Sequence, residues 1–556
     1  MYNNMKKIYL LLALAAGLAC TSCADMLDIP QKSAIETDKY YQEAGPEEAE
    51  ALIAAVYRRV TSMYDNQLGI FLDIITDDFH PGGGSFADNA DGYQEVGNLA
   101  ASASTTCISW MYQRGYQVIY YCNMILERIP ETDDPTVNRV KAEADFLRAL
   151  AMFELVRWYG NPPLVDHVPS ADEYYPENTP AETSINWVFD TMIDAAGRLP
   201  ALTAKGTQEQ FGARISKHAA LAYAGQVALW YGTRYDDDAW VAKAVEPLRT
   251  VIQSRLYGLV DDMSILNRGR GDFCEEYLFE HNNADNDGFP GSTQTNGDNL
   301  RQTYKTWSAE RILIPSNLVN MGWGWDVPTG DLGRFLTEHE GGIETKRFRS
   351  SLATYDQVMQ MDYTGRIIYN EDGTVQRGPG VFAAMDNNEG YFRMRDIFFQ
   401  EDLYDVGGFW KYSMANIPYL RYAEVLLMYA EVQFIVDGDA DGSGLAALNE
   451  VRLRDELEPL GSLTYQAIKD ERRAELIYDC ERYFDLVRWG DAAEELKDKG
   501  KTWYTFYGYK EDGKTWDVRT QPNPDGNGGW TDKYEYLPYP TTQLSVNPNL
   551  KQNPGW

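Results

Sequence analysis

The feature that most limits how this chain can fold is a set of long amphipathic helices. Apolar residues recur every three to four positions from 141 to 159, which marks one helical face. From 418 to 434 two such stripes run side by side, one through Leu420 and Leu427 and the other through Tyr422 and Leu426. A helix that is apolar on two sides must lie between other elements. The pattern therefore predicts a mainly α fold with a layered helical frame.

Several of the predicted helices follow one another in pairs. The pairs are 109–129 with 137–159, 215–231 with 238–254, and 418–434 with 445–453. Such pairs are typical of tetratricopeptide-like hairpins, which must stack on one another to bury their apolar faces. Single helices are also predicted over 47–64, 185–198 and 465–489.

The segment from about 258 to 412 differs in composition from the helical segments, because it is rich in Gly, Asn, Asp and aromatic residues. Its short strand-like runs are joined by turns such as 370–373, and a further hairpin is predicted over 504–517. We expect a single unit in which a helical scaffold, mainly 40–257 and 413–495, supports this loop-rich region. Loops on a rigid frame are the usual place for binding residues.

The N-terminus is typical of a secretory signal. Lys6 and Lys7 precede an apolar run from 8 to 18, which is shorter than the roughly 20 residues that span a membrane. Cys20 and Cys23 both follow small residues, as the acylated cysteine of a bacterial lipoprotein does. Either one could begin a mature, lipid-anchored chain, so that residues 1–19 or 1–22 would be removed.

Composition limits the classes of ligand. With 50 basic and 84 acidic residues the formal net charge is −34, which argues against binding to nucleic acid. Aromatic residues make up 13% of the chain, with 38 Tyr, 20 Phe and 14 Trp. Many must be core residues, but flat aromatic rings also suit the apolar faces of sugars.

Two motifs point weakly to a cofactor, and neither is convincing. Residues 508–515 match a phosphate-binding loop, but two acids lie in it and prolines follow, so a hairpin turn fits better. Asp437, Asp439 and Asp441 match the first half of an EF-hand loop, whereas position 12 is Leu448. That favours a polar turn and leaves calcium open. The five His residues have no HExxH spacing, so we predict no metal and no cofactor.

The helix from 470 to 490 carries many charges beside apolar residues. Catalysis is one interpretation, but Glu471, Glu475, Arg482, Asp485 and Arg488 all have partners at helical spacing. We therefore favour internal ion pairs that fix how the helix packs. Glycoside hydrolysis would need two suitably spaced carboxylates, and no sequence spacing singles out a pair among 84 acids. The sequence predicts no enzyme.

Four blocks of sequence resemble the SusD/RagB family of surface lipoproteins from Bacteroidetes. They are 142–165, 417–431, 471–490, and 537–540 with 547–556. The order is that of the family, and the start Cys23-Ala24-Asp25 also looks like a mature family member, which favours Cys23 over Cys20 and a signal of residues 1–22. The resemblance implies a SusD-like fold over 23–556, with tetratricopeptide-like helix pairs under a variable face.

The resemblance also implies a function of binding and import. Family members lie at the outer membrane, held by their lipid and facing the exterior, over a SusC-like TonB-dependent transporter to which they deliver oligosaccharides. A peptide-binding importer of the RagB type is the alternative, and a glycoside hydrolase is a weaker one. The family blocks do not identify the ligand, because the contacting residues lie in the variable loops.

A sugar site needs flat aromatic rings on loops with short polar side chains beside them. Two loop regions meet this condition, 79–93 and 289–325. We therefore expect glycan contacts from the following residues: Phe86, Asp88, Tyr93, Trp307, Trp323 and Trp325. If 323–325 is extended, its side chains alternate in direction, so only one of the two Trp residues would face the ligand.

Overall fold

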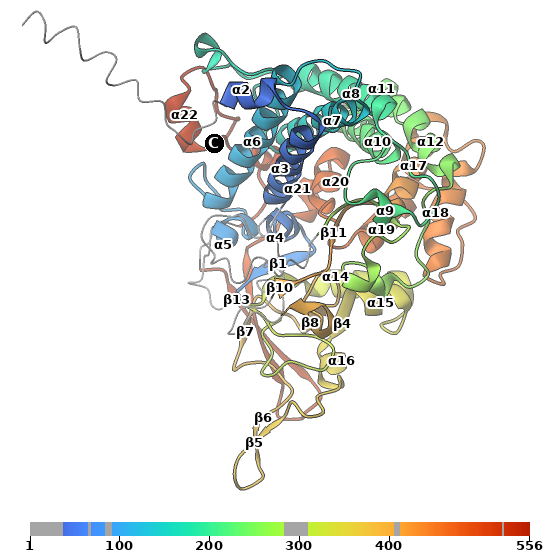
Figure 1. Ribbon diagram of the computed structural model, residues 1–556. Coiled ribbons are helices and arrows are strands. Elements are labelled where there is room, and N and C mark those ends of the chain that lie inside the picture. Colours follow the sequence, from blue (N-terminus) through green and yellow to red (C-terminus); the bar gives the residue numbers. More distant parts are fainter. Residues whose placement is uncertain are drawn as a thin grey trace, which may run out of the picture.

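The computed structural model describes residues 37–64, 68–83, 92–282, 308, 310–404, 412–524 and 528–556. Helices form the upper part of the molecule in Figure 1, and short strands and loops form the lower part, which tapers to a small hairpin. Cys23 and the predicted signal, residues 1–22, lie outside the described residues. No helix within these ranges is both long enough and apolar enough to cross a bilayer.

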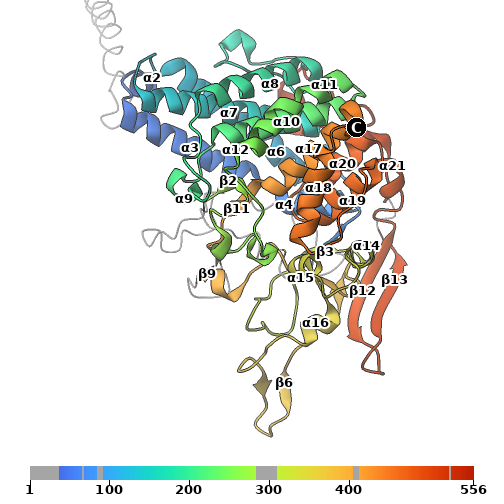
Figure 2. The same cartoon turned by 90° about the vertical axis from the view of Figure 1, so that its right-hand side faces the viewer.

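The helical part contains the three predicted pairs, and the prediction of a mainly α fold with tetratricopeptide-like hairpins is confirmed. These are α6 (Thr106–Arg128) with α7 (Pro135–Tyr159), α10 (Lys217–Arg234) with α11 (Asp238–Lys243) and α12 (Val245–Ser254), and α17 (Tyr422–Asp437) with α18 (Ser443–Arg454). Two predicted single helices, α3 (Pro46–Tyr64) and α8 (Ala181–Arg198), pack against α7. Figure 2 shows these helices stacked in layers above the strands.

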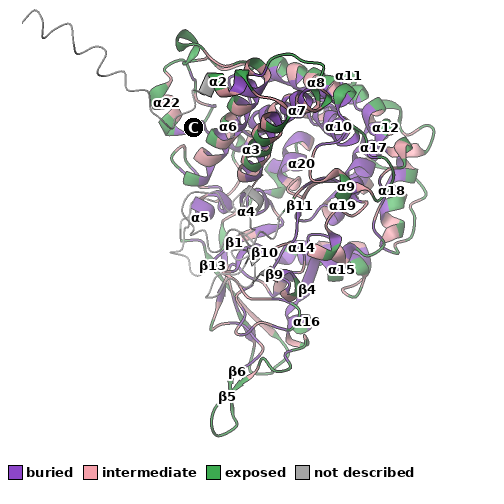
Figure 3. Ribbon diagram, viewed as in Figure 1, coloured by how far each residue is buried: buried purple, intermediate pink, exposed green. Residues whose placement is uncertain are grey.

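The helices α7 and α17 form the centre of this frame. Asp134 caps α7 by accepting hydrogen bonds from the backbone N–H groups of Thr136 and Val137. Almost every residue of α7 from Lys141 onward is buried, and so are residues 422–433 of α17. Figure 3 shows this buried centre and the more exposed outer helices around it. The two apolar stripes of α17 thus have neighbours on both sides, as the sequence predicts.

The predicted helix 465–489 is wrong as a single element. The structure has α19 (Tyr465–Glu475) and α20 (Arg482–Trp489), separated by a turn in which Tyr478 and Cys480 have φ values of 72° and 64°. The turn directs Asp479 toward Arg395 and Arg421, whose guanidinium groups lie 3.0 and 2.9 Å from its carboxylate oxygens. The turn thereby gives the buried Arg395 and Arg421 a carboxylate partner. A continuous helix would not bring Asp479 to this position.

The strand-rich part is held together by antiparallel pairs of distant segments. β1 (Phe79–Gly82) pairs with β3 (Trp325–Pro328), β2 (Tyr277–His281) with β11 (Ile417–Arg421), and β4 (Leu352–Thr354) with β8 (Tyr391–Arg393). Two short pairs are β5 (Ile368–Tyr369) with β6 (Val375–Arg377) and β9 (Leu403–Tyr404) with β10 (Tyr412–Ser413). This region also contains helices that the sequence pattern did not predict, among them α14 (Gly330–Glu340) and α15 (Lys346–Ser351). Thr329 caps α14 and Gly341, at φ 75°, ends it.

The predicted C-terminal hairpin is present as β12 (Thr502–Tyr509) and β13 (Trp516–Pro522). Asp512 accepts hydrogen bonds from the N–H groups of Lys514 and Thr515, so residues 508–515 form a turn between strands and no phosphate loop. β12 also pairs with β7 (Met385–Asp386). The hairpin therefore belongs to the strand-rich part, although helices of the frame precede it in sequence.

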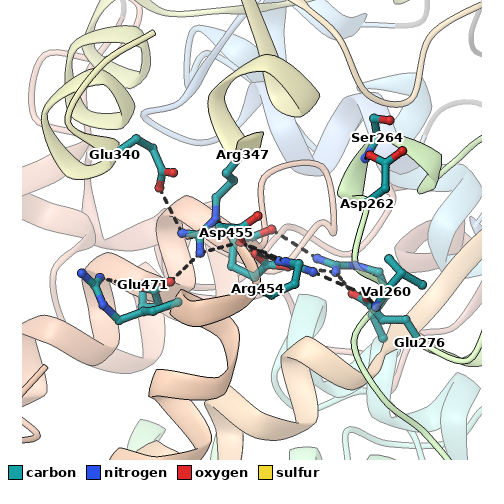
Figure 4. A network of polar contacts seen from close by, with 12 residues as sticks. Val260, Asp262, Ser264, Glu276, Glu340, Arg347, Arg454, Asp455 and Glu471 are labelled. Carbon is teal, nitrogen blue, oxygen red and sulfur yellow. Dashed lines mark hydrogen bonds and ion pairs between the residues drawn. The ribbon is translucent and has the colours of Figure 1, made fainter. Parts of the chain in front are cut away.

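A buried network of arginines and carboxylates joins the two parts of the molecule (Figure 4). The fully buried Arg347 of α15 lies 3.2 Å from Glu340, 2.9 Å from Asp455 and 2.7 Å from Glu471. Burial raises the pKa of Glu471, but Arg347, His339 and Arg452 together lower it to about 2, so this carboxylate is charged. The strand-rich part supplies Arg347 and Glu340, and the helical frame supplies Asp455 and Glu471.

Buried pairs of arginine and carboxylate also explain the many charges of α19 and α20. Arg421 at the end of β11 contacts Glu276 and Glu475, at 2.5 and 3.0 Å. Arg472 binds Asp485 through two hydrogen bonds of 2.9 and 3.0 Å. Internal ion pairs are therefore confirmed, but only Asp485 and Arg488 pair at the predicted helical spacing. The partners of Glu471, Glu475 and Arg482 come from other elements and are Arg452, Arg454 and Asp77.

We predict that Arg347→Ala lowers the free energy of unfolding by about 3–5 kcal/mol, because buried carboxylates lose their counter-charge. The matched control is Arg349→Ala on the same helix, whose side chain is 50% exposed and 4.0 Å from Glu344. Exposed pairs of this kind contribute about 0–1 kcal/mol. Chemical denaturation of both variants measures the difference. Equal losses would contradict a structural role for the network.

Candidate functional site

The structure describes three of the six residues predicted to contact a ligand, Tyr93, Trp323 and Trp325. Phe86, Asp88 and Trp307 lie outside the described residues. Tyr93 and Trp325 meet at the β1–β3 pair, where 79–82 and 325–328 form an antiparallel ladder with Gly82 opposite Trp325, and Trp323 lies two residues before β3.

Trp325 belongs to the core. Its side chain is 1% exposed, and its ring stands edge-on to that of Tyr93, itself 2% exposed, at 5.3 Å between centroids. Gly82 and Gly83 have φ values of 72° and 92°, and a Cβ on Gly82 would lie 2.2 Å from the carbonyl oxygen of Gly324. These glycines let the two chains approach closely enough to enclose the ring. Trp325 and Tyr93 are thus enclosed in the core and offer no ring face for the glycan contact expected of them.

Trp323 differs from Trp325 because it is only partly buried. Its indole packs against the main core on one side, and the N–H of Gly322 beside it donates to the carbonyl of Glu310 at 3.0 Å. Gly324, with φ 72°, turns the chain between the two Trp residues, so they do not follow the simple alternation of a strand. Of the two, only Trp323 retains surface for a ligand.

Three partly buried side chains are linked to Trp323 through its neighbour Gly324 and were not predicted from the sequence. Arg311 packs against Gly324, so close that a Cβ on this glycine would lie 2.8 Å from the Arg311 Cγ. Its guanidinium is 5.5 Å from the ring centroid of Phe382, and its charge also acts on Asp386. We name these four residues, Arg311, Trp323, Phe382 and Asp386, the Trp323 face. It combines two aromatic rings with a cation and a carboxylate.

The two halves of the Trp323 face are far apart in sequence. Ile312 and Val381 form an isolated antiparallel bridge, and the N–H of Leu313 donates to the carbonyl of Gly380 at 2.8 Å. No local sequence pattern predicts such a bridge. The sequence alone therefore does not indicate that Arg311, Phe382 and Asp386 belong to one site. Burial raises the pKa of Asp386, while hydrogen bonds from Trp503 and Thr505 and the charge of Arg311 oppose that rise.

Two buried acids lie next to this part of the chain, one preceding Arg311 and the other following Trp325. Glu310 is 6% exposed and accepts a hydrogen bond from the N–H of Arg393 at 3.0 Å, and burial raises its pKa to about 8. Asp326 is 1% exposed and ion-paired to Arg393, and burial raises its pKa to about 6. A pair of carboxylates with raised pKa values is typical of acid–base catalysis. Here both are enclosed beneath the surface, where they have no access to a substrate.

The predicted polar turn at 437–443 is a helix cap. The carboxylate of Asp439 accepts hydrogen bonds from the N–H groups of Gly444 and Leu445 at 2.6 and 2.8 Å, at the start of α18. Among the described residues, no group of three or more His, Cys, Asp or Glu side chains is arranged to hold a metal ion.

Comparison with known proteins identifies the family. A model described as the SusD family matches residues 275–556, which is more than half of the chain. A second model, described as starch-binding associating with outer membrane, matches residues 28–229. The chain belongs to the SusD family. The resemblance read from the sequence blocks is thereby confirmed.

Relatives cover nearly the full length. SusD-like protein P25 of Formosa agariphila is 23% identical over 96% of both chains, and the starch-binding protein SusD of Bacteroides thetaiotaomicron is 24% identical over 83% of this chain and 81% of its own. A solved laminarin-binding SusD-like protein has a TM-score of 0.70 at 24% identity, covering 93% of this chain and 100% of that one. Surface glycan-binding protein A of Bacteroides thetaiotaomicron, solved with laminarihexaose, has a TM-score of 0.69 at 18% identity, covering 91% and 99%. These similarities establish a SusD-like fold.

We predict that Trp325→Ala lowers the free energy of unfolding by about 3–5 kcal/mol, the cost of removing a large buried aromatic side chain. Trp323→Ala should cost clearly less, because part of its ring is already in contact with solvent. Thermal and chemical denaturation of the two variants test this order. A larger loss for Trp323→Ala would show that we have misassigned which Trp is the core residue.

Proposed function

We propose that this protein is a lipid-anchored binding protein of the outer membrane that captures oligosaccharides with its Trp323 face. The observation that carries the proposal is that Trp323 is only partly buried, with Arg311 packed against the adjacent Gly324, in a chain of the SusD family. Delivery of the oligosaccharide to a SusC-like TonB-dependent transporter completes the proposed role.

The chemistry of the Trp323 face suits a sugar. Sugar rings present C–H groups that pack on aromatic faces, and their hydroxyl groups hydrogen-bond with guanidinium and carboxylate groups. Trp323 and Phe382 supply the aromatic surface, and Arg311 and Asp386 supply the polar partners. The relatives named for binding laminarin and starch support the same class of ligand.

We infer binding without turnover. Glycoside hydrolysis needs a carboxylic acid and a carboxylate on either side of the scissile bond. Glu310 and Asp326 have suitably raised pKa values, but both are buried and Asp326 is ion-paired to Arg393. The relatives are described as binding proteins, which supports the same conclusion. A peptide ligand of the RagB type is the second candidate, since rings and charges also bind peptides.

We predict that Trp323→Ala weakens the binding of the preferred glycan by about 1–3 kcal/mol, roughly 5- to 160-fold in Kd, by analogy with bases stacked on aromatic rings. Calorimetry against laminarin, soluble starch and a set of peptides measures this change. The control is Tyr369→Ala, which removes a ring that is 58% exposed on the distant β5–β6 hairpin. Unchanged affinity in the Trp323 variant would exclude the Trp323 face, and binding of peptides alone would favour the second candidate.

We predict that Cys23 is acylated after removal of residues 1–22. Lipoprotein acylation attaches several chains, and more than one chain is needed for a stable anchor. Cys23→Ala should therefore move the protein from the membrane fraction to the soluble fraction, whereas Cys20→Ala should leave it attached. Membrane attachment of the Cys23 variant would contradict the assignment and favour Cys20.

A further inference from the structure

A second concave surface lies on the helical frame, away from the strand-rich part that carries the Trp323 face. It is a groove of about 790 Å³ between α6, the loop 163–176 and the C-terminal helix α22 (Thr541–Val546). Five tyrosines line it, so we call it the tyrosine groove: Tyr112, Tyr116, Tyr120, Tyr121 and Tyr174. In Figure 1 its elements α6 and α22 lie close together at the top left.

Two parallel stripes of side chains run along α6 in this groove. Tyr112, Tyr116 and Tyr120 follow one another at intervals of four, and so do Gln113 and Gln117. Side chains four apart lie above one another on a helix. The aromatic stripe from 112 to 120 is about 12 Å long at a rise of 1.5 Å per residue. A row of rings thus lies next to a row of amides.

The floor of the groove is held in place by contacts with neighbouring residues. The ring of Tyr112 stands edge-on to Tyr159 at 5.2 Å and to Tyr539 at 5.9 Å. Tyr116 donates its hydroxyl hydrogen to the carbonyl of Pro163 at 2.7 Å. Burial raises the pKa of both floor tyrosines, that of Tyr112 to about 12, so their hydroxyl groups stay neutral. A ligand would meet a preformed surface, which reduces the entropy lost on binding.

The rim of the groove exposes its rings. Tyr120 is 46% exposed on α6, and Tyr174 is 62% exposed on the opposite loop, directly after the short turn that Ser170 and Glu173 cap. Val546 of α22 is 65% exposed on the same groove. Exposed apolar side chains that gather around one hollow are typical of a binding site.

The charge of the groove indicates what kind of ligand it would accept. Of its lining residues only Arg59 and Glu173 carry full charges, of opposite sign, in a chain whose net charge is −34. Arg59 is already engaged, since it lies 4.0 Å over the ring of Tyr121 and donates to Gln117 at 3.4 Å. A nearly neutral surface of rings, amides and tyrosine hydroxyls suits a neutral, hydroxyl-rich ligand better than an ion.

We propose that the tyrosine groove is a second oligosaccharide-binding site, with Tyr120 and Tyr174 as stacking platforms and Gln113 and Gln117 as hydrogen-bonding partners. This inference rests on the proposed function, because it assigns the same class of ligand to a separate surface. Two sites on one protein would hold two positions of one long polysaccharide, so that the second contact forms at a high effective concentration.

The test uses the mature protein in detergent, with laminarihexaose and maltohexaose as short probes and laminarin and soluble starch as long ones. The preferred hexasaccharide should bind at two sites per chain. The double variant Tyr120→Ala/Tyr174→Ala should keep one site and its melting temperature, since both rings are exposed. Its affinity for the matching polysaccharide should fall about 100-fold, the lower end of the gain that linked sites give. Tyr120→Phe/Tyr174→Phe should keep both sites, and so should Tyr369→Ala.

The outcomes separate the two proposals. If Trp323→Ala removes one hexasaccharide site and leaves the other, and the groove variant does the reverse, both proposals hold. If wild type binds a single hexasaccharide and the groove variant binds it unchanged, the inference is overturned and the proposed function stands. If none of the four glycans binds, both are overturned. Increased hydrogen exchange of residues 24–36 in the groove variant, with unchanged glycan binding, would show that the groove holds the chain's own N-terminal segment and would also overturn it.

Discussion

Buried arginines hold the strand-rich part of this protein onto its helical frame. Arg347, Arg393, Arg395 and Arg421 are each 2% exposed or less, and each lies within 4 Å of a carboxylate of the helical frame. These carboxylates are, in the same order, Glu471, Asp73, Asp479 and Glu475. A buried charge left without its partner costs several kcal/mol, so each pair admits few other arrangements of the two parts. Hydrophobic contact is less directional and would tolerate more of them. The ion pairs thus fix where the short strands lie relative to the helices.

This constraint matters for binding because the proposed ligand contacts lie on loops. Arg393 pairs with Asp326 and donates its N–H to Glu310, and these two acids lie directly beside Trp325 and Arg311 in the sequence. The Trp323 face therefore rests on a buried ionic layer that continues into the frame through Arg395, Asp479 and Arg421. A loop supported in this way loses less conformational entropy when a ligand binds. In the tyrosine groove the loss of conformational entropy is also small, because the lining residues lie mainly on helix α6, whose backbone is already ordered.

The sequence predicts the frame well because long helices repeat their apolar pattern many times, and chance rarely imitates such a pattern. Prediction from the sequence fails where a single long-range contact, and not the apolar pattern, determines the local structure. The break at Tyr478 and Cys480 serves the pairing of Asp479, which lies far from its partners in sequence. Arg311 and Phe382 meet through a single isolated bridge between two segments that are far apart in the sequence. Trp325 resembles an exposed loop residue because Gly322 and Gly324 precede it. Gly82 and Gly83, from a distant part of the chain, let β1 approach closely enough to enclose its ring.

The central claim is that the protein holds glycans on a preformed surface and leaves them chemically unchanged. The most direct measurement incubates purified mature protein with laminarin and soluble starch, records binding by calorimetry and then determines the chain lengths of the recovered glycan by chromatography. The account predicts saturable binding of at least one of the two and an unaltered distribution of chain lengths. Progressive shortening of the glycan, or no binding to either, would contradict it.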